Sequence, residues 1–276
     1  MKILHSVHPD DFRKYDSSAI REHFLLQNLG QDNQANFVYT HYDRMVTGVI
    51  KPGSQALSLS NYGNLRSEYF LERREMGIIN VGGEGEITVD GETFSMKKLD
   101  CLYLGKGVNQ VEFKSKTVQE AAVFFVLSAP AHANFATTLM SSESATKVDL
   151  GSAHMANLRT IYKYIHKDGI KSCQLVMGLT ILHKGSVWNT MPAHTHDRRM
   201  EIYFYFDVAD DQRVFHYMGK PAETRHIVIG NHEAVVSPPW SIHAGSGTSN
   251  YSFIWGMAGE NMEFTDMDVV AIKDLL

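Results

Sequence analysis

Short apolar segments separated by turn residues dominate the hydrophobic pattern of the chain. Residues 77–81, 99–104, 201–206 and 227–229 are mostly apolar, and Gly or Asp follows each of them. Segments of this length with such borders are typical of β-strands. The pattern therefore predicts an all-β protein of the barrel or sandwich class.

Helical signals are sparse. Residues 16–26 begin with the N-capping residue Asp16 and continue with apolar residues at helical spacing, which predicts a short helix. A second short helix is predicted from about Ser152 to Tyr164.

Two blocks of the sequence, 77–107 and 201–239, show the same order of predicted strands and turns. In each block a strand hairpin is followed by a short strand that ends in a corner rich in Gly or Pro. We predict one barrel unit used twice, with a joint near residues 140–165. The two predicted domains are residues 1–150 and 151–276.

The run Gly82-Gly83-Glu84-Gly85 has the glycine content of a phosphate-binding loop, whose backbone amides approach an anion. Such a loop opens a helix, whereas the residues that follow, 86–89, have a strand pattern. We therefore predict a glycine-rich hairpin turn.

Composition and charge narrow the classes of partner. The chain has 276 residues, of which 43% are hydrophobic and 21% charged, and its net charge of −5 with no basic cluster argues against nucleic acid. Its two cysteines, Cys101 and Cys173, lie far apart, which indicates a reducing compartment and not a disulfide framework. No signal peptide and no segment of bilayer length is recognisable. We expect a cytoplasmic protein without a membrane or nucleic-acid partner.

The clearest chemical signal lies between residues 188 and 206. His194 and His196 are two positions apart, so in an extended segment both imidazoles point to the same side. After a polar reversal, Glu201 begins an aromatic strand and can meet the imidazoles across the sheet. His243, which follows a Pro-Pro corner, is the fourth candidate ligand.

Three imidazoles and one carboxylate suit Zn²⁺, Mn²⁺, Fe²⁺, Co²⁺ or Ni²⁺, and the sequence does not choose among them. A lone His-x-His in a chain with 14 histidines is as readily a coincidence as a site. The additional presence of Glu201 and His243 favours a metal site over a coincidence. The other histidines have no such partners in sequence, and we expect them to be structural.

Two groups of residues resemble the two metal motifs of the cupin superfamily. The first group is Gly185, His194, His196 and Glu201, and the second is Gly230, Pro238 and His243. Residues 77–107 resemble a cupin half without metal histidines, because the corner at 104–109 contains none. The resemblance implies a bicupin, that is, two double-stranded β-helix (jelly-roll) barrels with a few short helices. Residues 151–276 would bind the metal and residues 1–150 would not.

Longer sequence segments resemble the 5-keto-4-deoxyuronate isomerase family, the 4-deoxy-L-threo-5-hexosulose-uronate ketol-isomerases of pectin breakdown. These segments are residues 69–75, 102–107, 188–192, 194–206, 223–228, 237–243 and 253–257. The resemblance covers nearly the whole chain, and the family's metal positions carry over unchanged onto His194, His196, Glu201 and His243. It implies that the chain converts 5-dehydro-4-deoxy-D-glucuronate to 3-deoxy-D-glycero-2,5-hexodiulosonate. It also implies one divalent metal per chain and a homo-oligomer, expected to be a hexamer.

Such an isomerisation removes a proton next to a carbonyl, so negative charge develops on oxygen. A divalent cation stabilises that charge, and because no redox change is required, we expect Zn²⁺.

The sequence leaves the proton carrier open. Glu201 is one candidate, although binding to a metal weakens a carboxylate as a base. Tyr203 and Tyr205 share strand parity with Glu201 but are equally typical barrel aromatics. His226 has a side chain suited to proton transfer, and a structural role fits it as well.

Candidate contacts to the keto-uronate are Arg199 and Arg225, with Arg198 behind them, because arginine pairs with a carboxylate through two N–H groups. Solvated turn arginines would look the same in sequence. Glu223 is a further candidate, as a contact to the substrate or as a proton carrier.

Two other functions remain open at this stage. A cupin oxygenase uses a similar ligand set to activate dioxygen, so activity retained without oxygen and with Zn²⁺ would exclude it. A non-catalytic sugar-binding bicupin would turn over no keto-uronate.

Overall fold

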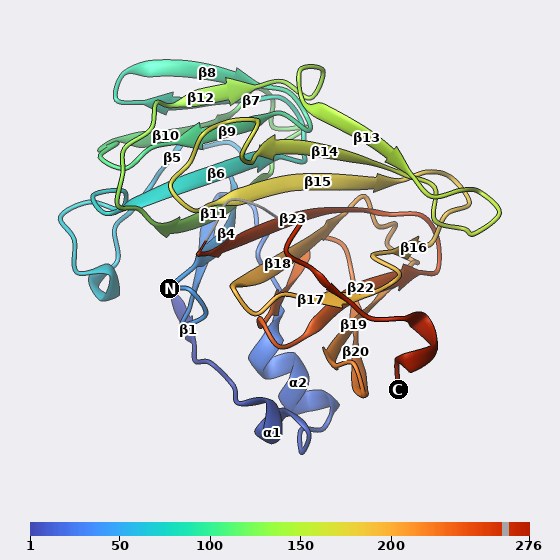
Figure 1. The fold of residues 1–276 in the computed structure, drawn as a ribbon. Coiled ribbons are helices and arrows are strands. Elements are labelled where there is room, and N and C mark those ends of the chain that lie inside the picture. Colours follow the sequence, from blue (N-terminus) through green and yellow to red (C-terminus); the bar gives the residue numbers. More distant parts are fainter. Residues whose placement is uncertain (261–264) are drawn as a thin grey trace. The chain divides into compact units, whose positions relative to one another are not determined.

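The computed structural model describes residues 1–260 and 265–276. Almost all of its regular structure is β-strand, so the predicted all-β class is confirmed (Figure 1). Among the described residues, no helix has both the length and the apolar character needed to cross a membrane.

The chain forms two compact units, and neither is one continuous stretch. The first unit consists of Met1–Leu4, Asn28–Thr146 and Tyr164–Val176, and the second of His5–Gln27, Lys147–Lys163 and Met177–Leu276. The contiguous domains 1–150 and 151–276 that the sequence predicts differ from these units by two exchanged segments, 5–27 and 164–176, and by residues 147–150, which belong to the second unit. Each of these segments is tied to its unit by contacts far away in sequence, which local patterns do not reveal.

The first unit contains a seven-stranded and a four-stranded sheet. In spatial order the larger sheet consists of β1 (Lys2–Leu4), β3 (Gln34–Thr40), β4 (Val46–Lys51), β11 (Phe124–Pro130), β6 (Arg74–Asn80), β9 (Cys101–Leu104) and β12 (Thr138–Met140). The smaller sheet consists of β5 (Leu57–Ser58), β10 (Val111–Ser115), β7 (Gly85–Val89) and β8 (Glu92–Met96). A short 3-10 helix, η1 (Gly63–Leu65), lies between β5 and β6.

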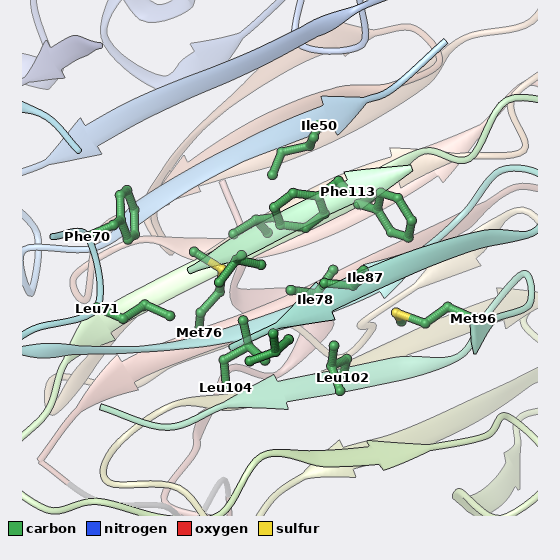
Figure 2. Packing of buried hydrophobic residues seen from close by; sticks show 14 of the residues in the cluster. Ile50, Phe70, Leu71, Met76, Ile78, Ile87, Met96, Leu102, Leu104 and Phe113 are labelled. Carbon is green, nitrogen blue, oxygen red and sulfur yellow. The ribbon is translucent and has the colours of Figure 1, made fainter. Parts of the chain in front are cut away.

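The interior of the first unit is filled by apolar side chains. Met76 and Ile78 of β6 pack with Ile87 of β7, Leu102 of β9 and Phe113 of β10, and none of these five side chains is exposed (Figure 2). Along β10 buried and exposed residues alternate, as expected for a strand with one face on the core.

Glycine residues 82, 83 and 85 connect strands of different sheets. β6 ends at Asn80 and β7 begins at Gly85, and these two strands are not paired with each other. The predicted turn is therefore confirmed, but the predicted hairpin at this place is wrong. The hairpin is formed by β7 and β8, which Asp90 and Gly91 connect with positive φ angles of 47° and 93°.

The second unit repeats the two-sheet arrangement. Its larger sheet consists of β13 (Thr146–Leu150), β14 (Arg159–Ile165), β15 (Val176–Leu182), β23 (Ser252–Gly259), β18 (Arg199–Phe206), β21 (Glu233–Ser237) and β2 (Leu25–Leu26). Its smaller sheet consists of β16 (Trp188–Asn189), β22 (Ile242–Gly247), β19 (Val214–Lys220) and β20 (Glu223–Ile229). A short pair, β17 (His194–Thr195) with β24 (Asp268–Val269), and the 3-10 helix η2 (Ile272–Asp274) complete it.

The N-terminal helices α1 (Pro9–Phe12) and α2 (Ser17–Phe24) belong to the second unit. The Asp16 carboxylate caps α2 by accepting a hydrogen bond from the backbone of Ala19 at 2.8 Å. The helix predicted at 16–26 is therefore confirmed up to Phe24, whereas Leu25 and Leu26 form the strand β2. Phe12 and Phe24 pack against the ring of Trp240.

The helix predicted from about Ser152 to Tyr164 is wrong. Its second half is the strand β14, which lies between β13 and β15 in the larger sheet. The segment Arg159–Ile165 carries β-branched and aromatic residues, which favour a paired strand over a helix.

The two units match strand by strand, which allows their interiors to be compared. Val89 and Lys220 end the equivalent strands β7 and β19 at the hairpin, so Ile87 corresponds to Met218. Ile87 pairs with Phe113, and Met218 pairs with His243. His243 therefore occupies the position that Phe113 has in the first unit.

Glu201 has an equivalent in the same way. β9 and β21 end at Leu104 and Ser237, which pair with Met76 and Glu201 respectively. The positions that hold Glu201 and His243 in one unit thus hold Met76 and Phe113 in the other.

Candidate metal centre

Four side chains of the second unit bring their ligand atoms together. They come from β17 (His194), the segment directly after it (His196), β18 (Glu201) and β22 (His243), and all four ligand atoms lie within 4.8 Å of one another. The Nε2 atoms of His196 and His243 each lie 3.0 Å from Oε2 of Glu201. Nε2 of His194 lies 3.0 Å from Nε2 of His243.

Strand geometry explains this convergence. His194 and His196 are separated by one residue of an extended segment, which places both rings on one side of the chain. Glu201 is fixed between two neighbours in its sheet, opposite Met257 of β23 and Ser237 of β21. His196, Glu201 and His243 are only 1–4% exposed.

The hydrogen-bond pattern selects the nitrogen that faces the centre. Nδ1 of His196 donates to the backbone oxygen of Arg199 at 3.0 Å, so Nε2, which faces Glu201, is the nitrogen that could bind a metal ion. Burial, followed by the neighbouring His243, lowers the pKa of His194 to about 3, which keeps this imidazole neutral. Burial opposes ionisation of Glu201, but the surrounding imidazoles hold its pKa well below its usual range.

This donor set fits a divalent metal ion. Ligand atoms bound to such an ion at about 2.1 Å lie about 3.0–3.4 Å from their neighbours. The 3.0 Å separations among the four residues agree with this spacing. Neutral imidazoles and a carboxylate are the ligand types of zinc and related ions.

A cavity of about 330 Å³ lies beside the centre, within the second unit. His194 and Glu201 form part of its wall, and Phe253, Trp255 and Met257 of β23 form an apolar side. The volume is at the lower end of the range for small-molecule sites. A metal held by the four residues would therefore be next to a space of substrate size.

The comparisons with known proteins agree with this site. A model of the KduI/IolB family matches residues 24–272. The chain belongs to the KduI/IolB family. Two similar family relatives are the 4-deoxy-L-threo-5-hexosulose-uronate ketol-isomerases of Shouchella clausii (strain KSM-K16) and Bacillus subtilis (strain 168). They are 53% and 48% identical over 275 residues, and each comparison covers 100% of both chains. The family membership predicted from the sequence is confirmed.

Solved structures with the same fold include an IolB-like protein from Salmonella typhimurium LT2. It has a TM-score of 0.69 and 13% identity, covering 90% of this chain and 96% of that chain. The oxalate decarboxylase of Lactobacillus farciminis in its formate complex has a TM-score of 0.54 and 9% identity, covering 83% and 78%. At these identities the likeness concerns the fold alone, and it confirms the predicted cupin architecture of this KduI/IolB family chain.

Tyr203 lies in the cavity wall of this family member, as its strand parity predicts. Its hydroxyl is 3.1 Å from Oγ1 of Thr190, which also lines the cavity. Thr190 has a φ of 49°, a left-handed conformation that is unfavourable for a β-branched residue. Burial and then the charge of Glu201 raise the pKa of Tyr203 well above its ordinary value, so the phenol is a hydrogen-bond donor.

Arg199 is the one predicted carboxylate-binding residue that reaches the cavity. Its side chain is 2% exposed and forms an ion pair with Asp266. Arg198 is exposed and pairs with Glu260 at 2.9 Å.

The other predicted residues, Arg225, Glu223 and His226, lie on β20 and do not line the cavity. Arg225 and Arg13 both pair with Glu223, at 3.0 and 2.8 Å. His226 is exposed and packs against Phe215. Their proximity to the metal motifs in sequence does not bring them to the cavity, because β20 lies at the edge of the smaller sheet.

Two cationic residues of the cavity, Arg159 and Lys163, were missed from the sequence. Both lie on β14, in the segment for which a helix was predicted. The signal that could have revealed them is the alternation of Arg159, Ile161 and Lys163, which places all three on one face of a strand.

Proposed function

We propose that this chain is a metal-dependent ketol-isomerase that converts 5-dehydro-4-deoxy-D-glucuronate to 3-deoxy-D-glycero-2,5-hexodiulosonate in uronate and pectin catabolism. The observation that carries the proposal is the convergence of His194, His196, Glu201 and His243 at the wall of a substrate-sized cavity. Relatives about half identical over the full chain, named as this isomerase, support it.

The same four residues would hold one divalent ion, which we propose is Zn²⁺. When bound, it would polarise the substrate carbonyl and stabilise the negative charge that develops on oxygen. Zn²⁺ suits a reaction without a redox change.

The chain's own residues would handle the proton. Glu201 is the only acidic residue among the described residues of the cavity wall. Its Oε2 lies against His196 and His243, and no contact of Oε1 is seen among the described residues. We propose that Oε1 accepts the proton from the hydroxyl-bearing carbon and returns it to the neighbouring carbon, while the hydroxyl proton passes to the former carbonyl oxygen.

Metal removal tests the proposal directly. The protein, with its metal content measured, is incubated with the keto-uronate that oligouronide lyase produces, and the products are followed by NMR in D₂O. We expect turnover to disappear after treatment with a chelator and to return with Zn²⁺. Deuterium should appear on the carbon that gains hydrogen, because the transferred proton exchanges with solvent. Turnover that survives complete metal removal would contradict the proposal, and product without deuterium would contradict the proton route.

Tyr203 gives a second test. We expect Tyr203→Phe to lower kcat about 10- to 100-fold with unchanged metal content, because the phenol is a donor beside the reacting oxygen. Tyr217→Phe is the matched control: its hydroxyl also contacts a hydroxyl side chain, Ser246, at 2.9 Å, but it lies outside the cavity wall. Steady-state kinetics give kcat for both variants. Equal effects on kcat would show that the Tyr203 hydroxyl takes no part in the reaction.

The same assays separate the other candidate functions. An oxygenase would require dioxygen, whereas an isomerase works equally well without it. A sugar-binding protein would bind the keto-uronate without converting it. A homo-oligomeric state and a cytoplasmic location stay predictions from the sequence.

A further inference from the structure

The cavity beside the metal centre has cationic residues on a strand that contributes no metal ligand. Arg159 and Lys163 of β14 line it together with Ile161 between them. The only acidic residue among the described wall residues is Glu201, whose carboxylate already lies against two imidazoles. The described wall residues therefore offer Arg159 no further carboxylate of their own.

Arg159 differs from the other arginines near the site in its partners. Arg199 pairs with Asp266 and Arg225 with Glu223, whereas Arg159 contacts no carboxylate among the described residues. Its Nη1 donates to the backbone oxygen of Asn157 at 2.9 Å, which holds the side chain in place. The remaining N–H groups of the guanidinium can form a two-pronged contact with a carboxylate.

The surroundings of Arg159 make an anionic ligand favourable. The side chain is partly buried, and this burial lowers the pKa of Arg159 while the phenols of Tyr203 and Tyr251 partly offset the effect. A partly desolvated charge gains more from an ionic partner than an exposed one does. Arg159 and Tyr203 line the same cavity as the candidate ligands His194 and Glu201, so one bound molecule can contact both Arg159 and the metal centre.

We infer that Arg159, with Lys163 as a second cation, binds the carboxylate of the substrate while its carbonyl end lies at the metal centre. The inference rests on the proposed isomerase function and explains its substrate specificity. The cavity accepts open-chain sugar acids and discriminates against neutral sugars of the same length. The sequence assigned carboxylate binding to Arg199 and Arg225, but these two residues already pair with acidic residues of the protein, Asp266 and Glu223. We therefore assign carboxylate binding to Arg159.

The test compares two substrates on two variants. Wild type, Arg159→Gln and Arg159→Lys are assayed, metal-loaded, on the keto-uronate and on its analogue with a hydroxymethyl group in place of the carboxylate. We expect Arg159→Gln to lower kcat/KM about 100-fold for the keto-uronate, mainly through KM, and less than about 3-fold for the neutral analogue. Arg159→Lys should restore part of the loss, because the charge remains but the two-pronged geometry does not.

Arg213→Gln is the matched control. Arg213 is exposed, its guanidinium also donates to backbone oxygens, those of Asp210 and Gln212, and it lies outside the cavity wall. It should change neither substrate's kinetics. Metal content and thermal stability of all variants are measured to exclude misfolding.

Several outcomes would overturn the inference. Equal losses on the acid and the neutral analogue would mean that Arg159 only supports the fold or the reaction, and unchanged KM for the acid would mean that the carboxylate binds elsewhere. If the wild type does not isomerise the keto-uronate, the proposed function is wrong. Binding of the keto-uronate, measured by calorimetry, then still tests whether Arg159 binds its carboxylate. Binding weakened about 100-fold in Arg159→Gln would support the carboxylate site, and equal binding, or none to wild type, would refute it.

Discussion

Replacing His243 with alanine is expected to abolish metal binding and to lower kcat/KM for the keto-uronate by about three orders of magnitude or more. His243 is 1% exposed, and its Nε2 lies 3.0 Å from both Glu201 and His194, so its removal breaks two of the close contacts in the donor set. The loss leaves a void and only three ligands, in a place where no other described His, Cys, Asp or Glu joins the group. Metal analysis of the purified variant and its steady-state kinetics measure the effect.

His154→Ala is the control for this variant. His154 is exposed and lies in the second unit, outside the cavity wall, so its replacement should leave metal content and kinetics unchanged. A His243→Ala protein that keeps a full equivalent of metal, or that turns over at the wild-type rate, would remove His243 from the centre.

Replacing Glu75 with glutamine is expected to destabilise the protein by about 3 kcal/mol or more. The Glu75 carboxylate is fully buried in the first unit and accepts four hydrogen bonds. The Tyr103 hydroxyl and the backbone of Cys173 donate to Oε2 at 2.7 and 2.6 Å, and the backbones of Gln174 and Leu175 donate to Oε1 at 2.8 Å. An amide group would turn N–H toward some of these donors and leave them without an acceptor.

Urea unfolding followed by circular dichroism measures the change, and hydrogen exchange at residues 172–175 reports on the local loss of these bonds. Glu112→Gln is the control, since Glu112 is an exposed residue of β10 in the same unit and the substitution is chemically identical. A Glu75→Gln protein as stable as the control would show that the carboxylate is not required.

The metal centre could be predicted from the sequence because its signal is local. His194 and His196 are two residues apart, and Glu201 follows after a short reversal, so the strand pattern alone places three ligands together. The partners of His243 are more than 40 residues away, so the sequence offered it only as a histidine after a proline corner, and the resemblance to a known family supported the assignment. The structure brings all four together, which agrees with the predicted set.

The cationic residue proposed to bind the substrate could not be predicted, because the ion pairs of the arginines and the strand that carries Arg159 are seen only in the structure. Arg199 is paired with Asp266, 67 positions later, and Arg225 with Glu223, which also pairs with Arg13. Arg159 was hidden by a wrong helix prediction: the residues before it, Ser152 to Asn157, include good helix formers, but they form turns in the structure. The residues of Arg159–Ile165 favour a strand, and pairing with a neighbour on each side stabilises it.

The exchanged segments of the two units have a consequence for how such a chain can be divided. A cut near residue 150 would separate Phe12 and Phe24 from Trp240, and β2 from its neighbour β21. It would also separate Glu75 from its three backbone donors at residues 173–175. Although the barrels share one arrangement of strands, neither can be transferred alone. A chimaera between relatives has to exchange the N-terminal helices together with the barrel that contains the candidate metal centre, and residues 164–176 together with the other barrel.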